Sequence, residues 1–141
     1  MFDKEHEIPV NINIFEESER YNKFIEKHGM GNSYGNRAKA TIGTNGEIII
    51  AIDRPYYLSG GIKPEEIEAI IVHEKTEILD CSDNPHENAT LAEYRYILEK
   101  FGGERLKSYH VNLCNLMGGD NSVREKVLNS LRNEWTKTFC S

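Results

Sequence analysis

Residues 64–101, PEEIEAIIVHEKTEILDCSDNPHENATLAEYRYILEKF, contain two segments of helical periodicity joined by a short polar connection. Pro64 and Pro85 stand where the first turn of each helix would lie, a position at which proline costs no backbone hydrogen bond. The connection Ser-Asp-Asn at 82–84 is short, and short connections favour antiparallel neighbours. The stretch therefore predicts an antiparallel helix pair over residues 64–80 and 85–101.

Ionisable side chains lie on the apolar faces of both predicted helices. At 100° per residue, Glu74 falls in the middle of an isoleucine face, with His73 and Glu77 at its edge. His86 and Glu93, seven residues apart, share one stripe of the second helix. Antiparallel packing brings Glu93 level with His73, and His86 level with Glu77. Because burying such groups without partners is costly, the pattern predicts a metal ion, a catalytic site or a hydrogen-bond network.

The segment HEKTE at 73–77 resembles the HExxH signature of zinc-dependent hydrolases. The first and fifth positions of that signature hold the metal ion, and the glutamate between them acts on the metal-bound water. We therefore predict His73, Glu77, His86 and Glu93 as metal ligands and Glu74 as the catalytic general base. A glutamate replaces the second histidine of the signature. Zn²⁺ is the favoured divalent ion. Mn²⁺ and Fe²⁺ are the alternatives, because carboxylates are hard ligands.

The same residues carry a resemblance to a family of small, largely uncharacterised proteins, many of them encoded by bacteriophages. Its pattern is a strand that ends in Ile-Asp, a helix with HExxE and a helix with HxxATxxE. The resemblance covers roughly residues 40–101 and implies a minimal, zincin-like metallopeptidase. The matching residues here are Ile52-Asp53, 73–77, His86, Ala89, Thr90 and Glu93.

Two other interpretations of these residues remain open. A bare HExxE pattern is common in charged helices, and a buried His–Glu network could fix the helix pair without a metal ion. The function could then be that of a catalytically inactive, zincin-like binding protein or a virion-associated accessory protein, instead of a metal-dependent peptidase or amidase. Cys81 lies one turn beyond Glu77 and is either a further ligand or, more simply, a small buried thiol.

The remainder of the chain predicts a small sheet and further helices. Residues 8–15 alternate like a half-buried strand, and 16–28 predict a polar helix. Residues 38–43 and 47–53 flank Asn45-Gly46, a strong hairpin signal. The apolar run 48–52 requires cover on both faces. Helices are expected over 104–117 and 121–137, with Leu128 and Trp135 helping to close the core.

We therefore expect a single α+β domain over residues 1–141. A small, mainly antiparallel sheet should pack against the antiparallel helix pair, with additional C-terminal helices.

Composition narrows the function classes. The 141-residue chain has a net charge of −6 and no long basic run, so we expect no nucleic-acid partner. No stretch approaches the roughly 20 apolar residues of a membrane span, and the first ten residues lack a signal-peptide pattern. The three cysteines form no CxxC pair. We expect a soluble protein, cytoplasmic in a host cell or virion-associated, whose partners are a peptide or protein substrate or phage virion proteins.

Overall fold

The computed structural model describes residues 8–31 and 37–140, with side chains as far as residue 134. Contacts divide the chain into two compact units, Met1–Pro55 and Tyr56–Ser141. The first contains a sheet and the second a group of helices, so the fold class is α+β as predicted. The prediction that the whole chain is one domain stays a prediction.

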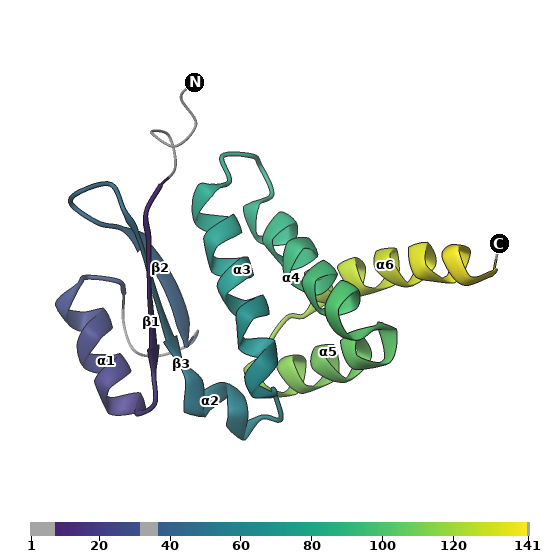
Figure 1. Cartoon of the computed structure of the whole chain (residues 1–141), viewed down its shortest axis with the longest axis horizontal. Coiled ribbons are helices and arrows are strands. Elements are labelled where there is room, and N and C mark those ends of the chain that lie inside the picture. Colours follow the sequence, from purple (N-terminus) through teal and green to yellow (C-terminus); the bar gives the residue numbers. More distant parts are fainter. Residues whose placement is uncertain (1–7, 32–36, 141) are drawn as a thin grey trace. The chain divides into compact units, whose positions relative to one another are not determined.

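The sheet of the first unit has three strands, β1 (Val10–Phe15), β2 (Ala38–Ile42) and β3 (Ile48–Asp53), in the order β1-β3-β2. β3 therefore lies between the other two strands, all of which are labelled in Figure 1. β3 runs antiparallel to β2 and parallel to β1. The sheet is therefore mixed, with one pair of each kind, where we expected a mainly antiparallel sheet. Helix α1 (Ser18–Lys27) follows β1 and returns the chain, so that β1 and β3 point the same way.

The central strand is fully buried, as its apolar run predicts. All six residues of β3 are buried, and Ile48, Ile50 and Ile52 have no exposed surface. Ile49 and Ala51, on the opposite face, pack with Tyr21 and Ile25 of α1. Helix α1 thus covers one face of the sheet. The cover predicted from the helices at 64–80 and 85–101 stays a prediction.

The hairpin between β2 and β3 closes as expected. The Gly43 N–H donates to the Glu47 carbonyl at 2.7 Å, and Gly46 has a φ of +81°. Such a positive φ is open to glycine without the steric cost that other residues meet, which explains the Asn-Gly signal.

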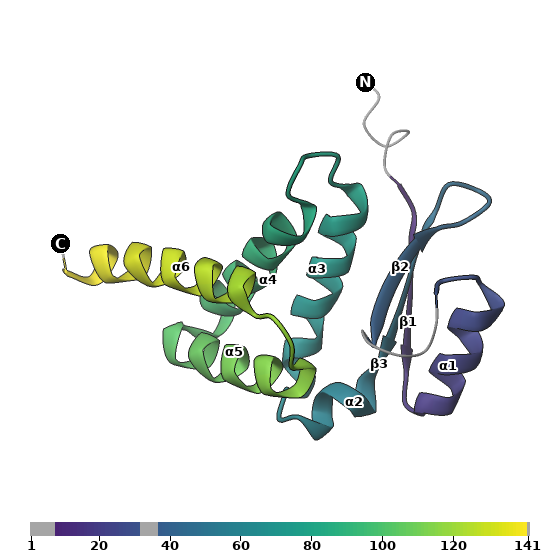
Figure 2. The same ribbon diagram turned by 180° about the vertical axis from the view of Figure 1, so that it is seen from behind.

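The second unit is helical. Helix α2 (Arg54–Ser59) starts at the boundary of the units and leads to a 3₁₀ turn at Pro64–Glu66. The predicted pair follows as α3 (Ile67–Leu79) and α4 (Pro85–Phe101), and Figure 2 shows the two helices side by side. The last helices are α5 (Gly103–Met117) and α6 (Ser122–Cys140), close to their predicted ranges.

Helix α4 is the central element of this unit, because it packs against α3, α5 and α6. Its Tyr94 and Ile97 have no exposed surface, like Leu106 of α5 and Leu131 of α6. Leu128 is buried as predicted, whereas the side chain of Trp135 lies outside the described residues. In the described part of the chain, no helix combines the length and the apolar character needed to cross a membrane.

Candidate metal centre

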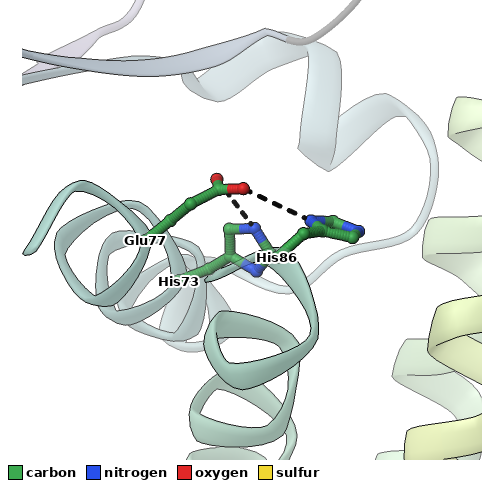
Figure 3. A group of neighbouring side chains, drawn as sticks. All are labelled: His73, Glu77 and His86. Carbon is green, nitrogen blue, oxygen red and sulfur yellow. Dashed lines mark ion pairs between the residues drawn. The ribbon is translucent and has the colours of Figure 1, made fainter. Parts of the chain in front are cut away.

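His73, Glu77 and His86 come together between α3 and α4. Each offers one ligand atom, and these atoms all lie within 4.8 Å of one another. His73 Nε2 is 3.5 Å from one oxygen of Glu77, and His86 Nδ1 is 3.6 Å from the other. Figure 3 shows the Glu77 carboxylate within reach of both imidazole rings. Among the residues that the structure describes, this is the group whose chemistry and spacing suit a metal ion.

The local structure explains why these three side chains meet. His73 and Glu77 are four residues apart on α3, so one helical turn brings them to the same side. His86 lies in the first turn of α4, directly after the connection. The Asp80 carboxylate accepts hydrogen bonds from the Ser82 N–H and from the Asn88 side chain, both at 2.8 Å. These bonds tie the connection to the first turn of α4 and so fix His86 near α3.

The distances within the group are longer than those of direct hydrogen bonds. Hydrogen bonds between nitrogen and oxygen span about 2.7–3.2 Å. Around a tetrahedral Zn²⁺, with ligand distances of about 2.0–2.2 Å, neighbouring ligand atoms lie about 3.3–3.6 Å apart. The separations of 3.5 and 3.6 Å fall in the second range, but they involve the two different oxygens of Glu77. Two imidazoles and one carboxylate are also a donor set of catalytic zinc sites, which leave a fourth position open.

Glu93 contacts the other ring nitrogen of His73. Its Oε1 is 2.8 Å from His73 Nδ1, a true hydrogen-bond distance, and its side chain is 1% exposed. When Nδ1 donates its proton to Glu93, the lone pair of Nε2 faces Glu77. Carboxylates in this position orient metal-binding histidines. The contacts therefore favour an orienting role for Glu93, where the sequence predicts a direct ligand.

Glu93 is itself held by residues of the C-terminal helices. Arg124 Nη1 donates to its Oε1 at 3.1 Å, and the Tyr109 hydroxyl donates to its Oε2. Sequence reasoning missed both partners. One signal for Arg124 exists, because Arg124 shares a helical face with Val127, Leu128 and Leu131. An arginine on an apolar face requires a buried partner of opposite charge. Tyr109 gives no comparable signal.

At neutral pH the site brings two carboxylates together with positively charged partners. Contacts with His73 and His86 lower the pKa of Glu77. Burial raises the pKa of Glu93, but the Arg124 charge and the His73 contact outweigh burial and lower it overall. Burial alone would lower the pKa of His73. The contacts with Glu77 and Glu93 outweigh burial and raise the pKa of His73 to about 9. Two ionised carboxylates thus flank His73, and a cation at its Nε2 is favoured.

Glu74 lies on α3 next to His73, on the arc that carries buried Ile67, Ile70 and Ile71. Its side chain is partly buried, and its charge helps to raise the pKa of His73. This is the neighbourhood expected of the predicted general base. The catalytic role itself stays a prediction.

The remaining candidates lie apart from the group. Cys81 is exposed, so the expectation of a buried thiol is wrong. His110 is buried and satisfied, with the Tyr94 hydroxyl at 2.6 Å from Nδ1 and Glu125 at 2.8 Å from Nε2. Thr90 is fully buried, and its hydroxyl donates to the His86 carbonyl at 2.8 Å within α4.

Comparisons of the chain with protein families, with curated proteins and with solved structures found no match. The resemblance to phage-encoded metallopeptidases therefore stays a prediction that rests on the motifs alone.

Proposed function

We propose that this protein binds one divalent metal ion through His73, Glu77 and His86 and uses it to hydrolyse an amide or peptide bond. The observation that carries the proposal is the geometry of His73. Its Nδ1 is engaged by Glu93 at 2.8 Å, while its Nε2 stands 3.5 Å from the Glu77 carboxylate. The ring is thus oriented toward a site of metal-ligand spacing.

Zn²⁺ is the ion that this donor set favours. Two imidazoles and a carboxylate match the His₂Glu set of zinc hydrolases. With Glu93 in an orienting role, the set has one carboxylate and is softer than the four-residue set of the sequence prediction. Mn²⁺ and Fe²⁺ are the alternatives that an added oxygen ligand would favour. The side chains of Glu77 and His86 are 37% and 50% exposed, so an ion can reach them from solvent.

The reaction consumes one water molecule. A bound divalent ion would acidify water and polarise the substrate carbonyl. Glu74 would take a proton from the water as its oxygen bonds to the carbonyl carbon. Glu74 would then give that proton to the amine nitrogen as the carbon–nitrogen bond breaks.

A second candidate is a binding or virion-associated accessory protein that has the same zincin-like helix pair but catalyses no hydrolysis. One observation favours it. Every buried side-chain nitrogen or oxygen of the described residues already has a hydrogen-bond partner, as a purely structural network would require.

A substitution of the proposed base separates the two candidates. We expect the wild-type protein, purified without chelators or a metal-binding tag, to contain about one equivalent of metal and to cleave members of a peptide library. Glu74→Gln should keep the metal and lose roughly 10²–10⁴-fold in hydrolysis. Glu68→Gln, on an exposed position of the same helix, is the matched control and should retain activity.

Two results would contradict the hydrolase. Undiminished activity in Glu74→Gln would remove the assigned base. A metal-loaded wild-type protein that cleaves no member of the library would leave the accessory protein as the remaining candidate.

A further inference from the structure

We infer that Arg124 is a positioning residue of the proposed metal centre: by holding Glu93, it fixes which nitrogen of His73 faces Glu77 and His86. The consequence for metal affinity rests on the proposed function. The consequence for the His73 ring does not, because it can be measured in the metal-free protein.

The contacts of Glu93 carry the inference. Its Oε1 accepts from His73 Nδ1 at 2.8 Å and from Arg124 Nη1 at 3.1 Å, so two donors share the atom that contacts the ring. The Tyr109 hydroxyl donates to the other oxygen. A carboxylate that is 1% exposed needs such donors on both oxygens, and a positive charge beside it. Arg124 supplies that charge.

The position of Arg124 indicates that its partner determines its conformation. It lies in the first turn of α6, is 7% exposed and faces inward with Val127 and Leu131. Its guanidinium also lies 5.7 Å from the centre of the Tyr94 ring. A guanidinium presents several donors in one plane, which a flexible ammonium does not. Arg124 can therefore hold the carboxylate at a set angle to His73.

Loss of Arg124 should release the His73 ring. The Glu93 carboxylate would keep Tyr109 and His73 as donors, but its Oε1 would lose the second donor and the positive charge that hold it in place. The imidazole could then turn, and Nε2 would no longer be held as a ligand. Loss of such outer contacts typically weakens metal binding about 10–100-fold.

The test compares Arg124→Met with Arg105→Met. Arg105 pairs with the buried Glu66 in the same helical unit but does not contact Glu93, so its loss also leaves a buried glutamate without its arginine. The first measurement is the His73 Nδ1–H resonance in the metal-free protein, by nitrogen-15 NMR. The second is the dissociation constant for Zn²⁺, by competition with a chelator.

We expect the wild type and Arg105→Met to show a slowly exchanging His73 Nδ1–H and similar zinc affinities. Arg124→Met should lose the slow exchange and bind Zn²⁺ about 10–100-fold more weakly. Arg124→Lys, which restores the charge, should recover part of both. An unchanged Nδ1–H signal and zinc affinity in Arg124→Met would overturn the inference, as would equal losses in Arg105→Met.

Two further outcomes keep the proposals separate. If the Nδ1–H signals follow the expected pattern but the wild type binds no Zn²⁺, the positioning of His73 stands and the proposed function fails. If Arg124→Met does not fold, Tyr109→Phe replaces it, because this variant removes one donor to Glu93 and leaves no unpaired charge. Tyr109→Phe should shift the same two measurements in the same direction by a smaller factor, and unchanged values would overturn the inference.

Discussion

The two nitrogens of His73 have different surroundings, and both a metal centre and a plain hydrogen-bond network can use this difference. Nδ1 makes a hydrogen bond of 2.8 Å with a buried carboxylate, whereas Nε2 faces Glu77 across 3.5 Å. A proton on Nε2 would make an ion pair that is longer than an ordinary hydrogen bond. A metal ion there would fill the gap at its normal ligand distances. Nε2 can therefore serve either interpretation. The pH dependence of stability tests the contacts of His73 that both interpretations share.

We predict that the metal-free protein loses stability as the pH rises from about 6.5 to about 9. The folded state raises the pKa of His73 from 6.5 to about 9, because contacts with Glu77 and Glu93 outweigh its burial. A raised pKa stabilises the fold fully below the unfolded value of 6.5, and this stabilisation disappears as the pH passes the folded value. The loss is on the order of 3 kcal/mol. Urea unfolding in chelator, measured across this range, gives the slope.

The matched control for this slope is His73→Asn. The asparagine amide can still donate to Glu93 from the place of Nδ1, but it neither titrates nor offers Nε2. We expect the variant to lack most of the decline between pH 6.5 and 9. An equal decline in His73→Asn would show that another group causes it. The lowered pKa of Glu93 acts in a separate, acidic window, where stability falls as the pH decreases.

At the scale of elements, α4 contributes His86 and Glu93 to the site and also packs at the centre of the helical unit. Its stripe contains His86, Thr90 and Glu93, but the Thr90 hydroxyl bonds to the helix backbone and not to the site. We predict that Thr90→Val keeps zinc binding and any hydrolysis, with a change in unfolding free energy of about 1 kcal/mol or less. Denaturant unfolding and metal analysis measure the two effects. A loss of metal in Thr90→Val would show that this hydroxyl supports the centre, as a family motif would suggest.

Much of the helix pair could be predicted from the sequence, because its signals are local. The prolines at 64 and 85 lie where the helical turns begin, and the short connection produces the expected antiparallel pairing. The pairing in turn brings Glu93 to His73, and His86 to Glu77, as the stripes predict. Periodicity and loop length carry this information without any knowledge of distant residues.

The features that the sequence did not predict depend on distant contacts or on weak local signals. Strand direction in the sheet depends on the path of α1, so the parallel pairing of β1 with β3 was missed. Helix α2 over residues 54–59 was not predicted either. The donors to Glu93 come from residues 16 and 31 positions further along the chain. A buried glutamate predicts that such partners exist, but it does not say which residues they are.

At the scale of the whole molecule, the proposed ion would link two consecutive helices directly and two later helices through the contacts of Glu93. Its ligands come from α3 and α4, and the chain from His73 through Glu93 to Arg124 and Tyr109 extends the link to α5 and α6. The net charge of −6 favours the approach of a cation over that of an anion. Binding that occurs only in the folded state adds to the free energy of unfolding by mass action.

We predict that Zn²⁺ raises the melting temperature of the protein relative to the same protein in chelator. At a free concentration of 100 times the dissociation constant, the gain is about 2.7 kcal/mol, or roughly 5–15 °C for a chain of this size. Differential scanning calorimetry measures it. His86→Ala should abolish the shift at little intrinsic cost, because this side chain is half exposed. His28→Ala, at the end of α1 and outside the group, should retain the shift. Identical melting of the wild type in Zn²⁺ and in chelator would leave the His–Glu network as a structural feature without an ion.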